Sequence, residues 1–288
     1  AMVAGGVKNI LIPNQVVGDS KIKRVIALAS EANIVVAADD AGNVEQPSAA
    51  ASGVGKEIGV IVEVNVGMNR CGTEPGEDTT ALARIITNSP GLRFDGVMGY
   101  EGHTVAIRDE SERRANAEGA MANLISAVEN IEAAGMPVNV VSAAGTGTYN
   151  ITGKMDRITD LQCGSYIFMD GDYMEVFEDF KPALTVLATV ISRPTSDRAV
   201  LDTGMKSMSI DRGLPMVVDQ PGATYEKISE EHGIMSVEGD AQRLKVGDKV
   251  QLRPMHGDTT INLHSHYFGI RKNKLDSIVE IAGRGRFR

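Results

Sequence analysis

Short runs of β-branched residues alternate with longer helical patterns along the first 170 residues. Such alternation is typical of βα units built around a mainly parallel sheet. The pattern predicts six strands, which cover residues 9–13, 33–38, 58–66, 92–100, 138–142 and 161–169. We therefore expect an α/β fold for this part of the chain.

The clearest helical pattern lies between the fourth and fifth predicted strands. It predicts a helix that ends at Gly135, before Pro137, and packs against the outside of the sheet. Its apolar stripe consists of Met121, Leu124, Ile125, Val128 and Ile131. Residues 46–55 are rich in small side chains, and this stretch fits either a helix or a loop.

The pattern changes after about residue 172, where strand-like runs follow one another without long helices between them. These runs are residues 183–192, 248–253, 264–270 and 277–281. We therefore expect two domains, a βα domain of residues 1–172 and a mostly β domain of residues 173–288. Six βα units are two fewer than a closed eight-stranded barrel needs, so the pattern alone favours an open six-stranded sheet.

Composition and charge narrow the classes of protein. Of the 288 residues, 42% are hydrophobic and 23% are charged, which is typical of a globular chain and excludes a disordered or collagen-like one. The formal net charge of -9 disfavours binding to nucleic acid or to an anionic membrane. No stretch approaches the roughly 20 apolar residues of a membrane helix, and the first residues lack a secretion signal. We therefore expect a cytoplasmic protein.

The two cysteines, Cys71 and Cys163, are too few for a disulfide framework and lack the C-x-x-C spacing of a zinc or redox site. We expect both to be buried thiols without a chemical role.

Polar residues follow three of the predicted strands, where parallel sheets build their active sites. Arg70 lies in a glycine-bracketed loop, and the segment from Tyr100 to His103 follows the next strand. The loop of residues 145–148 offers backbone N–H groups and hydroxyls that suit a phosphate. Two of these features also have a plain alternative, a surface ion pair for Arg70 and an ordinary Gly/Thr turn for the loop.

Residues 254–266 contain three of the five histidines. His256 and Asp258 are two positions apart, so in an extended chain their side chains face the same way and can share a metal ion. His264 and His266 repeat this spacing, although ordinary strand histidines are the simpler explanation for them.

Six segments, taken together and in order, resemble the D-threonine aldolase and D-serine dehydratase group of enzymes that use pyridoxal 5'-phosphate (PLP). The segments are VEVNVGMNRCG, GLRFDGVMGYEGH, VVSAAGTGTY, LQCGSYIFMDGDY, LDTGMKSMS and RPMHGDTTINLH. The resemblance implies a fold of alanine racemase type, in which a PLP-binding (β/α)8 barrel precedes a mostly β C-terminal domain. It also implies a homodimer that acts on a small D-amino acid.

The positions of this sequence that match the motifs of the family indicate which residues would form the site. Arg70 would lie near the pyridine nitrogen of PLP and Tyr100 beside its ring, and the other contacts to ring and phosphate would come from Thr146, Gly147, Gly164, Ser165 and Tyr166. His256 and Asp258 would hold a divalent metal ion. In the dehydratases of this group the resemblance implies a His-x-Cys pair that binds zinc. This sequence has Asp258 at the position of the cysteine, and an oxygen ligand in place of sulfur favours manganese or magnesium.

The resemblance also implies that the lysine which forms the Schiff base lies on the first barrel strand, ahead of the first residue of this sequence. The first two barrel strands would then be missing here, which agrees with the six predicted strands. The lysines of the first 60 residues, Lys8, Lys21, Lys23 and Lys56, do not lie in a matching context.

The expected function is a lyase that depends on PLP and a divalent metal and cleaves D-threonine or 3-hydroxy-D-aspartate to glycine and an aldehyde. One alternative is a dehydratase that releases a keto acid and ammonia, and another is a catalytically inactive PLP-binding fragment. A metal-dependent barrel hydrolase that uses His103, His256, Asp258, His264 and His266 is the weakest alternative, because most of these histidines fall in the second domain.

Overall fold

Six parallel strands, each hydrogen-bonded to the next along the chain, form the sheet of the first part of the protein. The computed structural model describes residues 1–218 and 220–286, and the chain divides into two compact units, Ala1–Gly164 and Ser165–Arg288. The strands of the first unit are β1 (Asn9–Gln15), β2 (Asn33–Ala38), β3 (Ile58–Glu63), β4 (Leu92–Gly99), β5 (Val140–Ala143) and β6 (Asp160–Leu161). The predicted α/β fold is confirmed.

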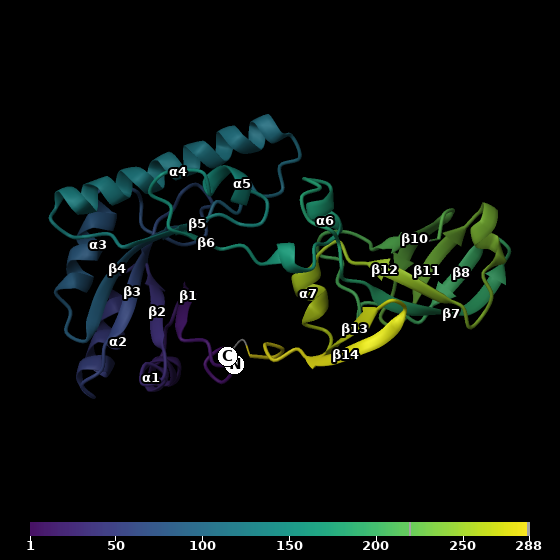
Figure 1. Cartoon of the computed structure of the whole chain (residues 1–288), viewed down its shortest axis with the longest axis horizontal. Helices are drawn as coiled ribbons and strands as arrows, with labels where there is room; N and C mark the ends of the chain where they lie inside the picture. Colours follow the sequence, from purple (N-terminus) through teal and green to yellow (C-terminus); the bar gives the residue numbers. More distant parts are fainter. Residues whose placement is uncertain (219, 287–288) are drawn as a thin grey trace. The chain divides into compact units, whose positions relative to one another are not determined.

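Helices connect these strands and cover one face of the curved sheet (Figure 1). They are α1 (Asp19–Leu28), α2 (Gly42–Ser52), α3 (Glu77–Thr87), α4 (Glu110–Ala133) and the short α5 (Tyr149–Thr152). The helix predicted from its apolar stripe is α4, whose N-terminus is capped by the Asp109 carboxylate at 2.8 Å from the Glu112 backbone nitrogen. The stretch that fitted a helix or a loop forms most of α2.

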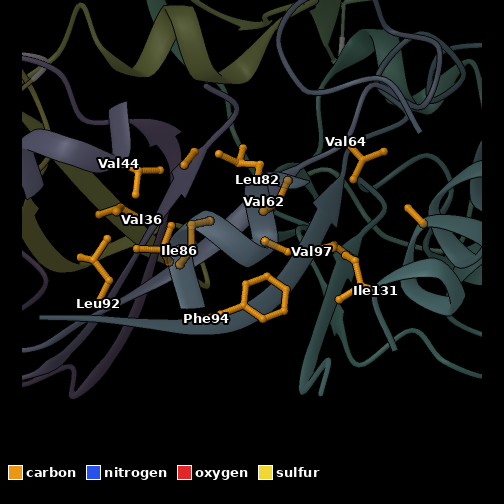
Figure 2. Close-up of a cluster of buried hydrophobic side chains, with 14 of the residues drawn as sticks. Val36, Val44, Val62, Val64, Leu82, Ile86, Leu92, Phe94, Val97 and Ile131 are labelled. Carbon is orange, nitrogen blue, oxygen red and sulfur yellow. The ribbon is translucent and has the colours of Figure 1, made fainter. Parts of the chain in front are cut away.

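A hydrophobic core fills the space between the sheet and these helices (Figure 2). Side chains alternate between the two faces of a strand, so every second residue of β2 and β3 points into this core, whereas on β4 an irregularity between Phe94 and Gly96 shifts the alternation by one residue. On β3 these are Ile58, Val60 and Val62, and α4 contributes Leu124 and Ile131 to the same core, where both are completely buried.

The intervening residues of the same strands line the opposite face of the sheet. Ala37, Ile61 and Met98 form a small cluster there. Two positions further along the chain, Asp39, Glu63 and Tyr100 replace these apolar residues with polar ones. This face therefore becomes polar at the carboxyl ends of the strands, where parallel sheets bind ligands.

The second unit is mostly antiparallel β-structure. Its six-stranded sheet has the order β10-β11-β8-β7-β12-β9, and β13 pairs with β14 in a separate hairpin. The strands are β7 (Val186–Thr195), β8 (Arg198–Leu201), β9 (Met216–Val218), β10 (Ala223–Ile228), β11 (Gly233–Val237), β12 (Lys249–Arg253), β13 (His266–Arg271) and β14 (Lys274–Glu280). Short helices are η1 (Ser165–Ile167), α6 (Gly171–Met174), η2 (Gly239–Arg243) and α7 (Gly257–Ile261).

The strand predicted over residues 161–169 is mostly wrong. Only Asp160–Leu161 pairs with β5, and Ser165–Ile167 forms the helix η1. The side chains of Tyr166 and Ile167 are 42% and 59% exposed, so the hydrophobic run does not belong to a buried strand. A run of apolar residues alone does not distinguish the two cases.

The expectation for the cysteines is wrong for Cys71. Its side chain is exposed because it lies in the loop that carries Arg70, whereas Cys163 is half-buried. Burial raises the pKa of the Cys163 thiol, and the nearby charge of Glu101 adds to this.

None of the described helices is both long enough and apolar enough to cross a lipid bilayer.

Candidate functional site

The loop that carries Arg70 is held in shape by its own backbone and by Asn65. The Asn65 side-chain oxygen accepts hydrogen bonds from the backbone N–H groups of Gly67 and Asn69, at 3.2 and 3.0 Å. The backbone of Thr73 bonds to residues 63 and 65, each at 2.9 Å, so the loop returns to the strand that it left. The exposed side chain of Arg70 therefore projects from a fixed backbone.

Arg70 lies over the ring of Tyr100, with its guanidinium carbon 5.8 Å from the ring centroid. Such a contact between a cation and an aromatic face is attractive. Two glycines allow the ring to pack closely, because a Cβ on Gly102 would collide with it and a Cβ on Gly145 would lie 3.0 Å from its edge. The structure thus brings two of the predicted site residues together at the ends of β3 and β4.

Glu101 fixes the loop that follows β5. Its side chain is completely buried, and one carboxylate oxygen accepts a hydrogen bond from the Ala144 backbone N–H at 3.0 Å. The other oxygen accepts hydrogen bonds from the hydroxyls of Thr148 and Thr152, at 2.7 and 2.8 Å. Ala144 has a φ of 65°, a conformation that costs energy in a residue other than glycine unless its surroundings hold it.

Thr146 and Gly147 lie in this loop. Thr146 is only 2% exposed, and a Cβ on Gly147 would collide with the carbonyl oxygen of Val105. Close packing against Val105 thus explains why position 147 carries glycine.

Glu63 is a buried carboxylate at the end of β3 that sequence reasoning did not identify. Gln15 donates a hydrogen bond to it from the end of β1. Burial raises the pKa of Glu63, while the Gln15 hydrogen bond and the positive charge of Arg70 act in the opposite direction. Glu63 therefore contacts Gln15 at the end of β1, two strands away in the sheet, and also interacts with the charge of Arg70.

Potential ligand atoms of Asp39, Glu63 and Cys71 lie within 4.8 Å of one another. Asp39 already uses one oxygen to accept a hydrogen bond from the Gly72 backbone N–H at 3.0 Å and the other from the Asn43 side chain at 2.9 Å. We therefore interpret this cluster as a brace for the loop of Arg70 rather than as a metal centre.

In the second unit, His256 immediately precedes α7, and Asp258 lies in the first turn of that helix. The segment is not extended at Asp258, because the helix begins at Gly257. The two side chains nevertheless meet, with His256 Nε2 3.8 Å from Asp258 Oδ2. Two donors that each lie about 2.1 Å from one ion are about 3.0–4.2 Å apart, so this pair fits a shared divalent cation.

Asp211 contacts the other nitrogen of His256. Its Oδ2 lies 2.6 Å from His256 Nδ1, and its Oδ1 accepts hydrogen bonds from the hydroxyls of Ser209 and Thr259, at 2.7 and 2.8 Å. Burial would raise the pKa of Asp211, but these hydrogen bonds and the His256 charge outweigh it and lower the pKa to about 2. The predicted motif at this place ended at Ser209, two residues before Asp211.

Asp170 fixes the position of the segment around His256. It is 2% exposed and accepts hydrogen bonds from the backbone N–H groups of Gly257 and Tyr173, at 2.9 and 3.1 Å. Burial raises the pKa of Asp170, and these two hydrogen bonds oppose that effect. The start of α7, and with it His256, is thereby tied to α6.

A shallow pocket of about 460 Å³ adjoins Asp258. It is lined by Asp258, Thr259, Asn262, Gly283 and Arg286. The neighbouring Arg284 donates hydrogen bonds to the Asn262 carbonyl at 3.3 Å and to the Ser265 hydroxyl at 2.9 Å, which holds the chain against α7. The pocket thus presents one carboxylate and one guanidinium to the same small volume.

Other candidates have different surroundings. Gly164 is the last residue of the first unit and is exposed, Ser165 begins η1, and the ring of Tyr166 lies 5.4 Å from that of Phe180. The ring of His264 contacts the Ser207 carbonyl at 2.8 Å, and His266 is exposed at the start of β13.

Two family models match the chain. The model described as "Alanine racemase, N-terminal domain" matches residues 6–172, and the model described as "Putative serine dehydratase domain" matches residues 183–270.

Curated relatives match over most of the chain. A D-threonine aldolase from Arthrobacter sp. is 38% identical over 98% of this chain and 76% of its own length. A 3-hydroxy-D-aspartate aldolase from Paracoccus denitrificans (strain Pd 1222) is 36% identical over 99% of this chain and 76% of its own length. A D-threo-3-hydroxyaspartate dehydratase from Delftia sp. (strain HT23) is 30% identical over 72% of this chain and 60% of its own length.

The fold is also similar to that of a solved structure. The crystal structure of D-threonine aldolase from Filomicrobium marinum matches with a TM-score of 0.97 and 36% identity, over 100% of this chain and 80% of that chain.

Proposed function

The chain belongs to the alanine racemase-like family that includes D-threonine aldolase and 3-hydroxy-D-aspartate aldolase, and we propose that it is a lyase dependent on PLP and a divalent metal. Its reaction is the cleavage of a D-3-hydroxy amino acid to glycine and an aldehyde. The resemblance inferred from the six sequence segments is thereby confirmed at the level of the family. The observation that carries the proposal is the facing pair of His256 and Asp258.

Residues of the first unit suit the binding of PLP. The Arg70 guanidinium and the adjacent Tyr100 ring provide a cation and an aromatic edge for the pyridine ring. Thr146 and Gly147 lie in the loop fixed by Glu101 and would bind the phosphate. The family resemblance alone adds Gly164, and Ser165 and Tyr166 of the second unit, as further contacts. When bound, PLP supplies an electron sink for the negative charge left on the glycine carbon.

His256 and Asp258 would hold the metal ion through one nitrogen and one oxygen. Such a donor set suits manganese or magnesium better than a thiolate would, so we propose one of these ions in preference to zinc. The bound ion supplies Lewis acidity that lowers the pKa of the substrate hydroxyl. Asp170 fixes the backbone that follows His256 and Asp211 contacts the ring at Nδ1, so the imidazole is held in place.

Arg286 favours a substrate with a second carboxylate. It lines the same pocket as Asp258, and a guanidinium pairs with a carboxylate through two parallel hydrogen bonds. This arrangement supports 3-hydroxy-D-aspartate as a better substrate than D-threonine.

A dehydratase is the second candidate, because the same two ligands would activate the hydroxyl as a leaving group. The aldolases match this chain at 36% and 38% identity against 30% for the dehydratase, which favours aldol cleavage. Homodimer formation and a cytoplasmic location are further parts of the proposal, and they rest on the family resemblance and the sequence.

The proposal rests on the facing pair of His256 and Asp258, so we test whether activity depends on a metal ion held by these two residues. The purified protein with added PLP is treated with EDTA, and aldehyde release is measured while Mn²⁺ or Mg²⁺ is titrated back. We expect activity to disappear and return with the metal, and His256→Ala and Asp258→Ala to abolish the return while the absorbance of bound PLP persists. Activity of Asp258→Ala in the presence of EDTA would show that the metal assignment is wrong. The exposed residue Asp240 provides the charge-matched control Asp240→Asn.

A further inference from the structure

Asp211 connects a loop of the second unit to the helix that carries Asp258. Three contacts join the loop to α7 and to the residue before it: the Asp211 carboxylate to His256, the Thr259 hydroxyl to Asp211, and the Ser209 backbone N–H to the Thr260 hydroxyl at 3.2 Å. Thr260 is 1% exposed, so the centre of this contact is packed. Contacts from the loop of Asp211 and from α7 therefore fix the position of Asp211 relative to His256.

The contact selects one form of the imidazole. The Asp211 carboxylate already accepts two hydroxyl hydrogen bonds, and a carboxylate at neutral pH has no hydrogen to donate. Nδ1 must therefore carry the hydrogen in the 2.6 Å contact with Asp211. A neutral imidazole has only one such hydrogen, so its lone pair is on Nε2. Nε2 is the nitrogen that faces Asp258, at 3.8 Å.

Asp211 Oδ2 and His256 Nδ1 lie too close together to be two ligands of one ion. Two donor atoms on one ion lie at least about 3.0 Å apart when each bond is about 2.1 Å long. The separation of Asp211 Oδ2 from His256 Nδ1 is 2.6 Å, which is a hydrogen-bond distance.

We propose that Asp211 is a positioning residue, which holds His256 in the tautomer with hydrogen on Nδ1 and thereby directs Nε2, together with Asp258, toward one divalent cation. This inference rests on the proposed function, because the cation is part of that proposal. A carboxylate on the far nitrogen orients the ring and makes the ligating nitrogen more basic. Loss of such a partner reduces metal affinity about 10- to 100-fold.

The first measurement reads the tautomer without metal, PLP or substrate. The ¹⁵N shifts of the histidine rings distinguish a nitrogen that carries hydrogen from one with a lone pair, and His256→Ala identifies the signals of His256 among the five histidines. We expect Nδ1–H in the unaltered protein and a mixture dominated by Nε2–H in Asp211→Ala. Nε2–H in the unaltered protein, or no change in Asp211→Ala, would overturn the inference.

The second measurement is equilibrium Mn²⁺ binding, followed by the loss of the electron paramagnetic resonance signal of free Mn²⁺. We expect Asp211→Ala to bind about 10- to 100-fold more weakly, Asp211→Asn to show a smaller loss in the same direction, and Asp240→Asn to bind normally. Asp211 is 41% exposed at its side chain, so its removal leaves no buried cavity. If circular dichroism shows that Asp211→Ala does not fold, unchanged affinity of Asp211→Asn overturns the inference instead.

The two proposals fail in different ways. If His256→Ala and Asp258→Ala lose Mn²⁺ binding while Asp211→Ala keeps it, the role of Asp211 is wrong and the proposed function stands. If the unaltered protein binds no Mn²⁺ or Mg²⁺ through His256 and Asp258, the proposed function loses its metal site. The tautomer measurement then still decides what Asp211 does to His256.

Discussion

Replacing Glu101 should destabilise the first unit and loosen the loop of residues 144–148. In Glu101→Ala, the Ala144 backbone N–H and the hydroxyls of Thr148 and Thr152 lose their acceptor in a completely buried place. Each unsatisfied buried group costs about 1–3 kcal/mol, so three cost about 3–6 kcal/mol after the hydroxyls have partly found other partners. This is a large part of the roughly 5–15 kcal/mol that stabilises a typical domain.

Glu101→Gln is a milder test of the same reasoning. If the glutamine NH₂ group faced the backbone N–H of Ala144, two donors would meet and neither would have an acceptor. The NH₂ group must therefore face the hydroxyls of Thr148 and Thr152, and these hydroxyls then accept hydrogen bonds instead of donating them. We expect a loss of about 1–3 kcal/mol, because charge-assisted hydrogen bonds become neutral ones. Urea unfolding followed by circular dichroism measures both variants, with Glu118→Gln on the exposed side of α4 as the control. A loss below about 1 kcal/mol in Glu101→Ala would refute the claim that this carboxylate holds the loop.

Three further predictions concern other groups of the two sites. Arg70→Ala should weaken PLP binding or shift its absorption spectrum, because the cation over Tyr100 is removed, and a spectrophotometric titration checks this. Arg286→Ala should reduce kcat/KM for 3-hydroxy-D-aspartate by about 10-fold or more and leave D-threonine almost unaffected, since only the first substrate has a second carboxylate to pair. The pKa of Asp211 is lowered from 3.8 to about 2, so its contribution to stability is complete above pH 3.8 and is lost as the pH falls through about 2. Acid unfolding of the metal-free protein should therefore show less pH dependence in this range for Asp211→Asn than for the unaltered protein.

Helices and strands could be predicted from the sequence where the hydrophobic residues of a run are also the ones buried in the structure. The runs at β2 and β3 are buried and β-branched, and α4 has an apolar stripe that ends before Pro137. The run of residues 161–169 is also mostly apolar, but Tyr166 and Ile167 are exposed in the structure. Hydrophobicity does not reveal burial there, since burial depends on which elements pack against the run.

Site residues could be predicted where a motif or strand end marks them, and not where only tertiary contacts do. Arg70 and Tyr100 follow neighbouring parallel strands, so their contact follows from the sheet. The partners of Glu101 lie 43 to 51 residues further along the chain, and Asp211 lies 45 residues before His256. Nothing in the local sequence marks these carboxylates as buried or as partners of the site.

The most direct test of the proposed reaction is the identity of its products. The full-length protein with PLP and Mn²⁺ is incubated with 3-hydroxy-D-aspartate, D-threonine and their L-enantiomers, and the products are identified by proton NMR. The account predicts equal amounts of glycine and the matching aldehyde, glyoxylate or acetaldehyde, from the D-substrates only. A keto acid with ammonia would contradict aldol cleavage and identify a dehydratase, and bound PLP without any product would contradict the assignment of this chain as a lyase.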